Sequence, residues 1–166
     1  FKSANSSKRS QANLYETNIY QYDNKPSDYA GGSRESNLKC DFQQGVTVEF
    51  WLKAPSPTSN SKQSIFHLTN SSGGDELNIF LSGTIGSPFH VSLTGSSTGV
   101  FRHQQVGSSP TTASISSWNH YAVSFKSASS GVQTKFYVNG KLDSTNTLGT
   151  AGINTLTQKG TIAHIA

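Results

Sequence analysis

The feature that most constrains this sequence is a series of short runs in which apolar and polar residues alternate. Residues 46–53, VTVEFWLK, show it most clearly: their aliphatic and Phe side chains fall on one side of an extended chain, and their polar side chains fall on the other with Trp51. A period of two is typical of a β-strand with one buried face. The sequence therefore predicts a strand there and further strands at 64–68, 76–82, 89–93, 119–126, 134–139 and 161–166.

The composition argues against helices. Ser occupies 28 and Thr 16 of the 166 positions, and these residues are poor helix formers. No apolar period of helical length occurs anywhere in the chain. Clusters of Gly, Ser, Thr, Asn and Pro separate the apolar runs, as in the loops of all-β domains.

One turn is predicted in detail. Asn139-Gly140 follows a predicted strand and precedes Lys141-Leu142, and Asn and Gly are the residues that most readily adopt positive φ. This pair predicts a tight hairpin with a type I′ turn. Without helices, each sheet can bury its apolar face only against another sheet. We therefore predict an all-β fold, an antiparallel two-sheet β-sandwich.

The chain length of 166 residues fits one domain. Residues 1–13 are mostly small, polar or basic and have no hydrophobic period, so they predict a linker or extended arm that follows another domain. The folded domain is predicted to span residues 14–166, because bulky side chains begin at Leu14.

The charge pattern makes two classes of partner unexpected. Lys and Arg number 13 against 9 Asp and Glu, but apart from Lys8-Arg9 the basic residues are spread singly. Nucleic-acid binding needs clustered cations, so no nucleic-acid partner is predicted. No apolar run has the length of a membrane helix, so no membrane partner is predicted either. Cys40 is the only cysteine and is expected to be a small packed residue.

The order of the predicted strands and two motifs resemble the laminin G-like domains of the concanavalin A-like lectin and glucanase superfamily. Residues 118–123, WNHYAV, are similar to the family's Trp-x-His-x-Ala-Val strand, and residues 137–140, YVNG, are similar to its Tyr-Val-Asp-Gly hairpin. The resemblance covers residues 29–166 and implies a jelly-roll sandwich. In its Ser-, Thr- and Gly-rich composition the chain also resembles modules of large phage virion and surface proteins.

The resemblance has one departure. Family members carry a further strand after the one that residues 161–166 resemble, and this chain ends at Ala166. The last strand of the sandwich is therefore expected to be missing, which leaves an open edge with unpaired backbone groups. Either the sequence is a fragment, truncated at its C-terminal end, or another chain segment completes the sheet.

The superfamily includes glycoside hydrolases, whose retaining members need two carboxyl groups roughly 5–5.5 Å apart. The only adjacent acidic pair is Asp75-Glu76, and neighbouring side chains of a strand point to opposite faces. Nothing resembles the laminarinase-like Glu-x-Asp-x-x-Glu pattern. We therefore expect no catalytic residues and no enzyme activity, and a glycoside hydrolase is the least favoured interpretation.

Calcium is the usual metal of the family that the chain resembles, held by carboxylates and backbone carbonyls of loops at one rim. Asp75 follows Gly73-Gly74 and Asp28 precedes Gly31-Gly32, so these two aspartates are the candidate calcium ligands. Neither has several carboxylates nearby in the sequence, and a solvated turn is the alternative interpretation for each.

Three residues are candidate ligand-binding residues. Tyr137 shares its strand face with Lys135 and is the better candidate for an exposed aromatic ring, while Arg102 and His103 lie in a polar stretch where a solvated strand or loop is the alternative. The rings of Trp51 and Trp118 could stack on sugars, but packing against the protein is the expected role of both. We expect His120 to be half-buried in a sheet.

These observations predict a non-catalytic adhesion or glycan-binding module of a larger surface or virion structural protein, placed outside the cell or on a virion surface. Its partners would be a glycan or protein surface and neighbouring domains or subunits. Loop tips at 55–63, 70–76 and 95–113 are polar enough to bind sugar hydroxyls. The alternative is a purely structural protein–protein interaction domain that decorates or cements a viral particle.

Overall fold

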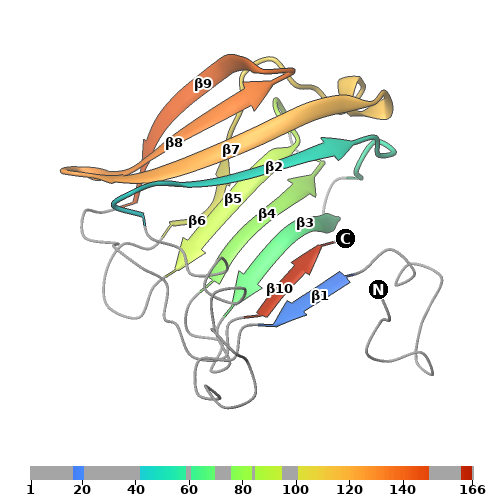
Figure 1. Ribbon diagram of the computed structural model, residues 1–166. Coiled ribbons are helices and arrows are strands. Elements are labelled where there is room, and N and C mark those ends of the chain that lie inside the picture. The colour runs from blue at the N-terminus through green and yellow to red at the C-terminus, as the bar shows by residue number, and fades with distance from the viewer. Residues whose placement is uncertain are drawn as a thin grey trace.

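The fold is a sandwich of two antiparallel β-sheets, as the alternating runs predicted. A computed structural model describes residues 17–20, 42–58, 61–69, 76–83, 85–94, 101–149 and 162–165. A four-stranded sheet lies over a six-stranded sheet, and the apolar faces of the two sheets meet between them (Figure 1). The predicted all-β fold, an antiparallel two-sheet β-sandwich, is therefore confirmed.

The six-stranded sheet has the order β1-β10-β3-β4-β5-β6, and the four-stranded sheet has the order β2-β7-β8-β9. A 3₁₀ turn, Ser114–Ser116, precedes β7. The strands are β1 (Thr17–Tyr20), β2 (Val46–Leu52), β3 (Lys62–Thr69), β4 (Glu76–Ser82), β5 (Phe89–Thr94), β6 (Phe101–Gln105), β7 (Asn119–Ala128), β8 (Gly131–Val138), β9 (Lys141–Leu148) and β10 (Ile162–Ile165).

The edge of the six-stranded sheet bears on the open edge expected at the C-terminal strand β10. One alternative was that another chain segment completes the sheet, and the structure shows such a segment: β10 pairs with β3 on one side and with β1 on the other. Thr17 lies opposite Ile165, and Tyr20 lies opposite Ile162. A segment from the beginning of the chain therefore covers the backbone groups of β10, and β1 is the edge strand. The predicted arm, residues 1–13, lies outside the described residues.

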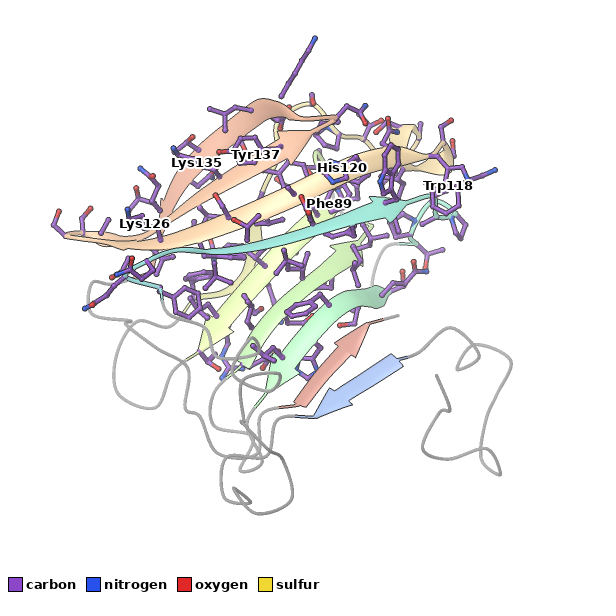
Figure 2. The ribbon with its side chains drawn as sticks, in the orientation of Figure 1. Phe89, Trp118, His120, Lys126, Lys135 and Tyr137 are labelled. Atoms are coloured by element: carbon purple, nitrogen blue, oxygen red, sulfur yellow. The ribbon has the colours of Figure 1, made fainter. Side chains whose placement is uncertain are left out.

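Local pattern explains the elements of the four-stranded sheet. Along β2, partly buried and exposed residues alternate strictly, as predicted for 46–53. In β8, Phe136 faces the core, while its neighbours Lys135 and Tyr137 lie on the side away from Phe89 (Figure 2). Asn139 and Gly140 join β8 to β9 with φ angles of 50° and 76°, and these positive values confirm the predicted type I′ hairpin.

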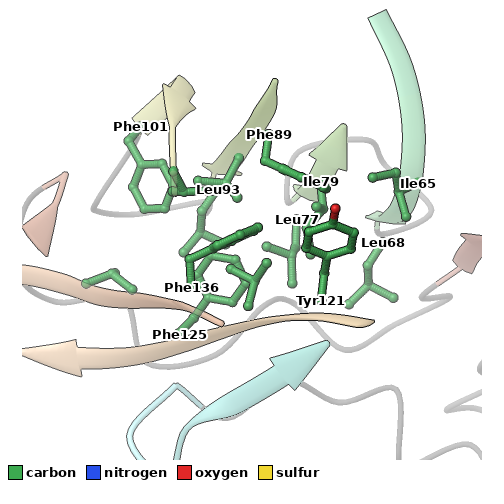
Figure 3. Close-up of a cluster of buried hydrophobic side chains, with 14 of the residues drawn as sticks. Ile65, Leu68, Leu77, Ile79, Phe89, Leu93, Phe101, Tyr121, Phe125 and Phe136 are labelled. Atoms are coloured by element: carbon green, nitrogen blue, oxygen red, sulfur yellow. The ribbon is translucent and has the colours of Figure 1, made fainter. Parts of the chain in front are cut away.

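The core is an aromatic and aliphatic layer between the two sheets (Figure 3). Phe89 of β5 lies at its centre, with ring centroids 4.5 Å from Tyr121 and 4.9 Å from Phe136 across the sandwich. Tyr121, Val123 and Phe125 share the inward face of β7, and each is at most 1% exposed. This packing fixes which faces of the sheets remain outside.

Besides β1, the strands β6 and β9 were not among the predicted runs. In β6 only Phe101 is buried, and the four residues after it are exposed. The sequence of β9, KLDSTNTL, is polar throughout its middle. Both strands lie at sheet edges, where a neighbouring strand supplies backbone hydrogen bonds and little apolar alternation is needed. Residues 101–105 were therefore wrongly included in the loop tip predicted at 95–113.

One core position invites a stabilising substitution. The side-chain oxygen of Thr134 is buried in the inward face of β8, and no described residue forms a hydrogen bond with it. Thr134→Val keeps the shape and removes this unpaired hydroxyl, so we expect the free energy of unfolding to rise by about 1 kcal/mol. Urea denaturation measures the change. A loss of stability would show that the hydroxyl has a partner.

Candidate functional site

The outer face of the four-stranded sheet, meaning the side directed away from the core, carries an unusual group of exposed side chains. Trp51 is 67% exposed and Leu142 is 55% exposed, although both are large and apolar. His120 and Tyr137 lie between them on the two central strands, and both are partly exposed. We call these four residues the outer-face platform.

Trp51 and His120 form one end of the platform. They are direct cross-strand partners on β2 and β7, and their ring centroids are 5.4 Å apart. The imidazole nitrogen Nε2 of His120 lies 3.8 Å from the Glu49 carboxylate. The side chain of His120 is 26% exposed, so the expectation that it is half-buried in a sheet is confirmed. The Trp51 ring is thus held beside His120 with most of its surface in solvent.

Strand register places Tyr137 and Leu142 at the other end. Across the sheet Glu49 lies opposite Ala122, Ala122 opposite Tyr137, and Tyr137 opposite Leu142. Ala122 is only 8% exposed, since its methyl group is short and the surrounding side chains are larger. The outer-face platform therefore runs diagonally over all four strands, with Ala122 between its two ends.

The end of the β8–β9 hairpin is tied to β7. The backbone N–H of His120 donates to the side-chain oxygen of Asn139 at 3.0 Å, and the backbone N–H of Asn139 donates to the His120 carbonyl at 2.8 Å. The Asn139 amide also donates to the side-chain oxygen of Asn119 at 2.9 Å. These bonds hold the hairpin in a fixed position beside the platform.

Both tryptophans differ from the prediction that they pack. Trp51 lies on the outward-facing side of β2. Trp118, the residue that precedes β7, is 65% exposed (Figure 2). The core position near Trp118 is filled by Ile115, which is fully buried and whose carbonyl accepts a hydrogen bond from the N–H of Ala54. The 3₁₀ turn brings Ile115 inward, so the next bulky residue is left outside.

A surface pocket of about 400 Å³ adjoins the platform at the hairpin. Leu142 belongs to both the pocket and the outer-face platform, because it lines the pocket and lies opposite Tyr137. The pocket is lined by Ser109, Val138, Asn139, Lys141, Leu142 and Asp143.

One wall of this pocket is organised by Asp143. Its carboxylate accepts hydrogen bonds from the backbone N–H of Ser108, from the Ser108 hydroxyl and from the backbone N–H of Ser109. Burial acts to raise the pKa of Asp143, but the hydrogen bonds from Ser109 and Ser108 together outweigh burial and hold its pKa below the usual value. Asp143 is therefore a stable anion that fixes the 108–109 loop against β9.

The structure does not bring the three predicted ligand-binding residues together. Tyr137 lies on the four-stranded sheet, whereas Arg102 and His103 lie exposed on β6 at the edge of the other sheet. His103 has a φ of 53°, its N–H donates to the Ser92 hydroxyl, and its Nε2 lies 2.9 Å from Nζ of Lys62.

The ring of His103 also contacts the ring of Phe80, at a centroid distance of 5.6 Å. The Phe80 ring in turn stacks on His90, at a centroid distance of 5.5 Å. Burial lowers the pKa of His90, a hydrogen bond to the Pro88 carbonyl opposes this, and the charges of His103 and Lys62 lower the pKa further. A neutral His90 suits a structural role in this cluster.

The two candidate calcium ligands, Asp75 and Asp28, lie outside the described residues. Among the residues that the structure describes, no group of three or more His, Cys, Asp or Glu side chains could hold a metal ion. The described carboxylates of Glu76 and Glu49 each lie near a histidine, at 3.6 Å and 3.8 Å. Cys40 is likewise outside the described residues.

Sequence reasoning missed several residues of this region. The pocket residues Ser109 and Asp143 are 34 positions apart, and no local pattern predicts their contact. Leu142 was recognised only as part of a hairpin arm. Its exposure could have been inferred from Tyr137, because a two-residue turn after Val138 places Leu142 opposite that ring.

Comparisons with known proteins agree with the architecture. A family model described as the concanavalin A-like lectin/glucanases superfamily matches residues 27–164. A solved structure of mouse laminin alpha1 chain, domains LG4-5, has a similar fold, with a TM-score of 0.50 and 15% sequence identity over 76% of this chain. The match covers 30% of the laminin chain, so this chain spans well under half of its length.

No curated protein matches the sequence significantly. The described part of the chain contains no helix with the length and apolarity that a membrane span requires.

Proposed function

The chain belongs to the concanavalin A-like lectin/glucanases superfamily, and from this premise we propose that it is a non-catalytic adhesion module that binds glycans through the outer-face platform. Laminin G-like domains commonly mediate adhesion or binding, are typically non-catalytic and are typically extracellular. In this proposal the module belongs to a larger surface or virion structural protein and acts outside the cell or on the virion surface.

The exposure of Trp51 is the observation that carries the proposal. A large ring that is 67% exposed on a regular strand leaves much apolar surface in water. The flat face of such a ring matches the apolar C–H face of a pyranose. Tyr137 offers a second ring two strands away, and Glu49 offers a carboxylate beside them that accepts hydrogen bonds from sugar hydroxyls.

A glycan array followed by calorimetric titration tests this function. We expect the 166-residue chain to bind at least one glycan of the array. Trp51→Ala should weaken that binding by about tenfold or more, because it removes the stacking surface. Trp51→Phe should retain part of the affinity.

Ile85→Ala is the matched control, because Ile85 is fully exposed and lies away from the outer-face platform, in the segment between β4 and β5. It should leave the affinity as it is. Absence of glycan binding by the intact chain would overturn the proposal and favour the structural alternative, in which the exposed tryptophans dock on a protein subunit of a viral particle. If Trp51→Ala leaves glycan binding unchanged, the glycan binds at a site other than the outer-face platform.

Two further parts of the proposal concern residues away from the platform. Arg102 and His103 are proposed as a second contact region, because both are exposed on the edge strand β6. Calcium is proposed to bind at Asp75 or Asp28 and to order the rim. Titrating the same glycan with calcium and with a chelator measures the calcium contribution, and Arg102→Ala measures the contribution of β6.

A further inference from the structure

The pocket beside Leu142 has a composition that suggests a ligand of its own. Its volume of about 400 Å³ is at the lower end of the range of ligand pockets, which is roughly 300–1,000 Å³. Two apolar residues, Val138 and Leu142, line it together with the polar residues of the hairpin and the 108–109 loop. The pocket is therefore suited to a small ligand with both an apolar and a polar side.

The walls of the pocket are held in place before any ligand arrives. Asn139 is bonded to His120 and Asn119 on one side. Asp143 holds the Ser108 and Ser109 backbone on the other. Both sets of bonds join segments far apart in the chain, so a ligand would meet a preformed site and would not have to order a loop.

The groups that face this space include donors and acceptors. Lys141 is exposed, and its ammonium forms no ion pair with a carboxylate in the described part of the chain. Asp143 carries a stable negative charge with more acceptor positions than its three donors use. One cation and one anion leave the pocket close to neutral, which disfavours a ligand with a net charge.

We propose that this pocket binds a single uncharged pyranose, the terminal residue of a glycan whose remaining units cross the outer-face platform. The apolar face of the sugar packs on Leu142, and its hydroxyls donate to Asp143 and accept from Lys141 and Ser109. From β9 to β2 the chain of sugars crosses three strand spacings, about 14 Å in all. This inference rests on the proposed function and adds that the protein recognises a chain end.

Nuclear magnetic resonance titration of the ¹⁵N-labelled chain with single sugars tests the pocket directly. The probes are the methyl glycosides of glucose, galactose, mannose, N-acetylglucosamine and glucuronic acid. We expect one of the four neutral probes to shift the backbone amide signals of Ser109, Asn139 and Leu142. The charged glucuronide should bind more weakly than that probe, and a preference for it would overturn the assignment to an uncharged sugar.

Two variants and one matched control complete the test. Lys141→Ala and Leu142→Ala should each weaken binding of the neutral methyl glycoside by about tenfold. Lys126→Ala removes the same charge from an exposed position near the other end of β7 from His120, and it should change the affinity less than twofold. Equal losses of affinity in Lys126→Ala and Lys141→Ala would show that the effect comes from the overall charge of the protein, and they would overturn the proposed sugar site in the pocket.

Failure of this inference can be told apart from failure of the proposed function. If oligosaccharide binding depends on Trp51 while no single sugar shifts the Ser109 and Leu142 signals, the pocket is overturned and the platform stands. If neither single sugars nor any array glycan binds, both are overturned. Shifts confined to the Trp51 and His120 signals would also overturn the pocket.

Discussion

Phe89→Ala is expected to lower the free energy of unfolding by about 3–5 kcal/mol, the range measured when a fully buried phenylalanine is truncated. Phe89 has no exposed surface, and its ring contacts Tyr121 and Phe136 of the opposite sheet. The ring of Phe50 follows at a centroid distance of 6.4 Å. Truncation leaves a cavity at the point where both sheets meet, and the aromatic neighbours cannot collapse into it without shifting their strands.

Urea denaturation followed by tryptophan fluorescence measures this loss. Phe89→Leu retains most of the apolar volume and should cost clearly less, about 1–2 kcal/mol. Ile85→Ala is the surface control and should change stability by less than about 0.5 kcal/mol, since Ile85 is fully exposed. A loss below about 1 kcal/mol for Phe89→Ala would contradict the placement of this ring in the core.

Gly83→Ala is expected to be the next most damaging substitution. A methyl carbon at Gly83 would lie 2.5 Å from the carbonyl oxygen of Pro57 and would also overlap the backbone of Thr58. Both obstacles are backbone atoms, which cannot rotate away as a flexible side chain does. The carbonyl of Thr58 is further fixed because it accepts hydrogen bonds from the N–H and the hydroxyl of Ser61. We expect a loss of about 1–3 kcal/mol.

The location of the damage separates this clash from a general effect of losing a glycine. In Gly83→Ala the amide signals of Thr58 and Ser61 should shift, because the methyl group pushes the 57–58 segment away. Gly140→Ala is the control: nothing lies within 4 Å of its added carbon, and its cost comes from the φ of 76° alone. Unshifted Thr58 and Ser61 signals in Gly83→Ala would contradict the close approach.

The central strands could be predicted because their pattern is local. β4 coincides with the predicted run 76–82, and β2 ends one residue before the predicted end of 46–53. The edge strands β6 and β9 carry too few apolar residues to show a period of two. They form because the neighbouring strands β5 and β8 offer free backbone groups. The strand β1 depends likewise on pairing with β10, at the far end of the chain.

The candidate site was predicted less well than the fold. Tyr137 was expected to be an exposed ring and is partly exposed, while the packing expected for Trp51 and Trp118 was wrong. Alternation put Trp51 beside Glu49 and Lys53 on the polar side, which was the signal for its exposure. For Trp118 no such signal existed, because the inward turn of Ile115 depends on a hydrogen bond to Ala54 from another part of the chain.

By itself, the sequence determined which side chains of each central strand face the core, because a period of two is a property of the extended backbone and needs no partner. Only the tertiary structure decided which outward side chains meet. His120 reaches Trp51 through the register of β7 on β2, and Asp143 reaches Ser109 through a loop that packs against the sheet edge. Register and loop docking depend on contacts between distant residues, and these exist only once the two sheets have formed.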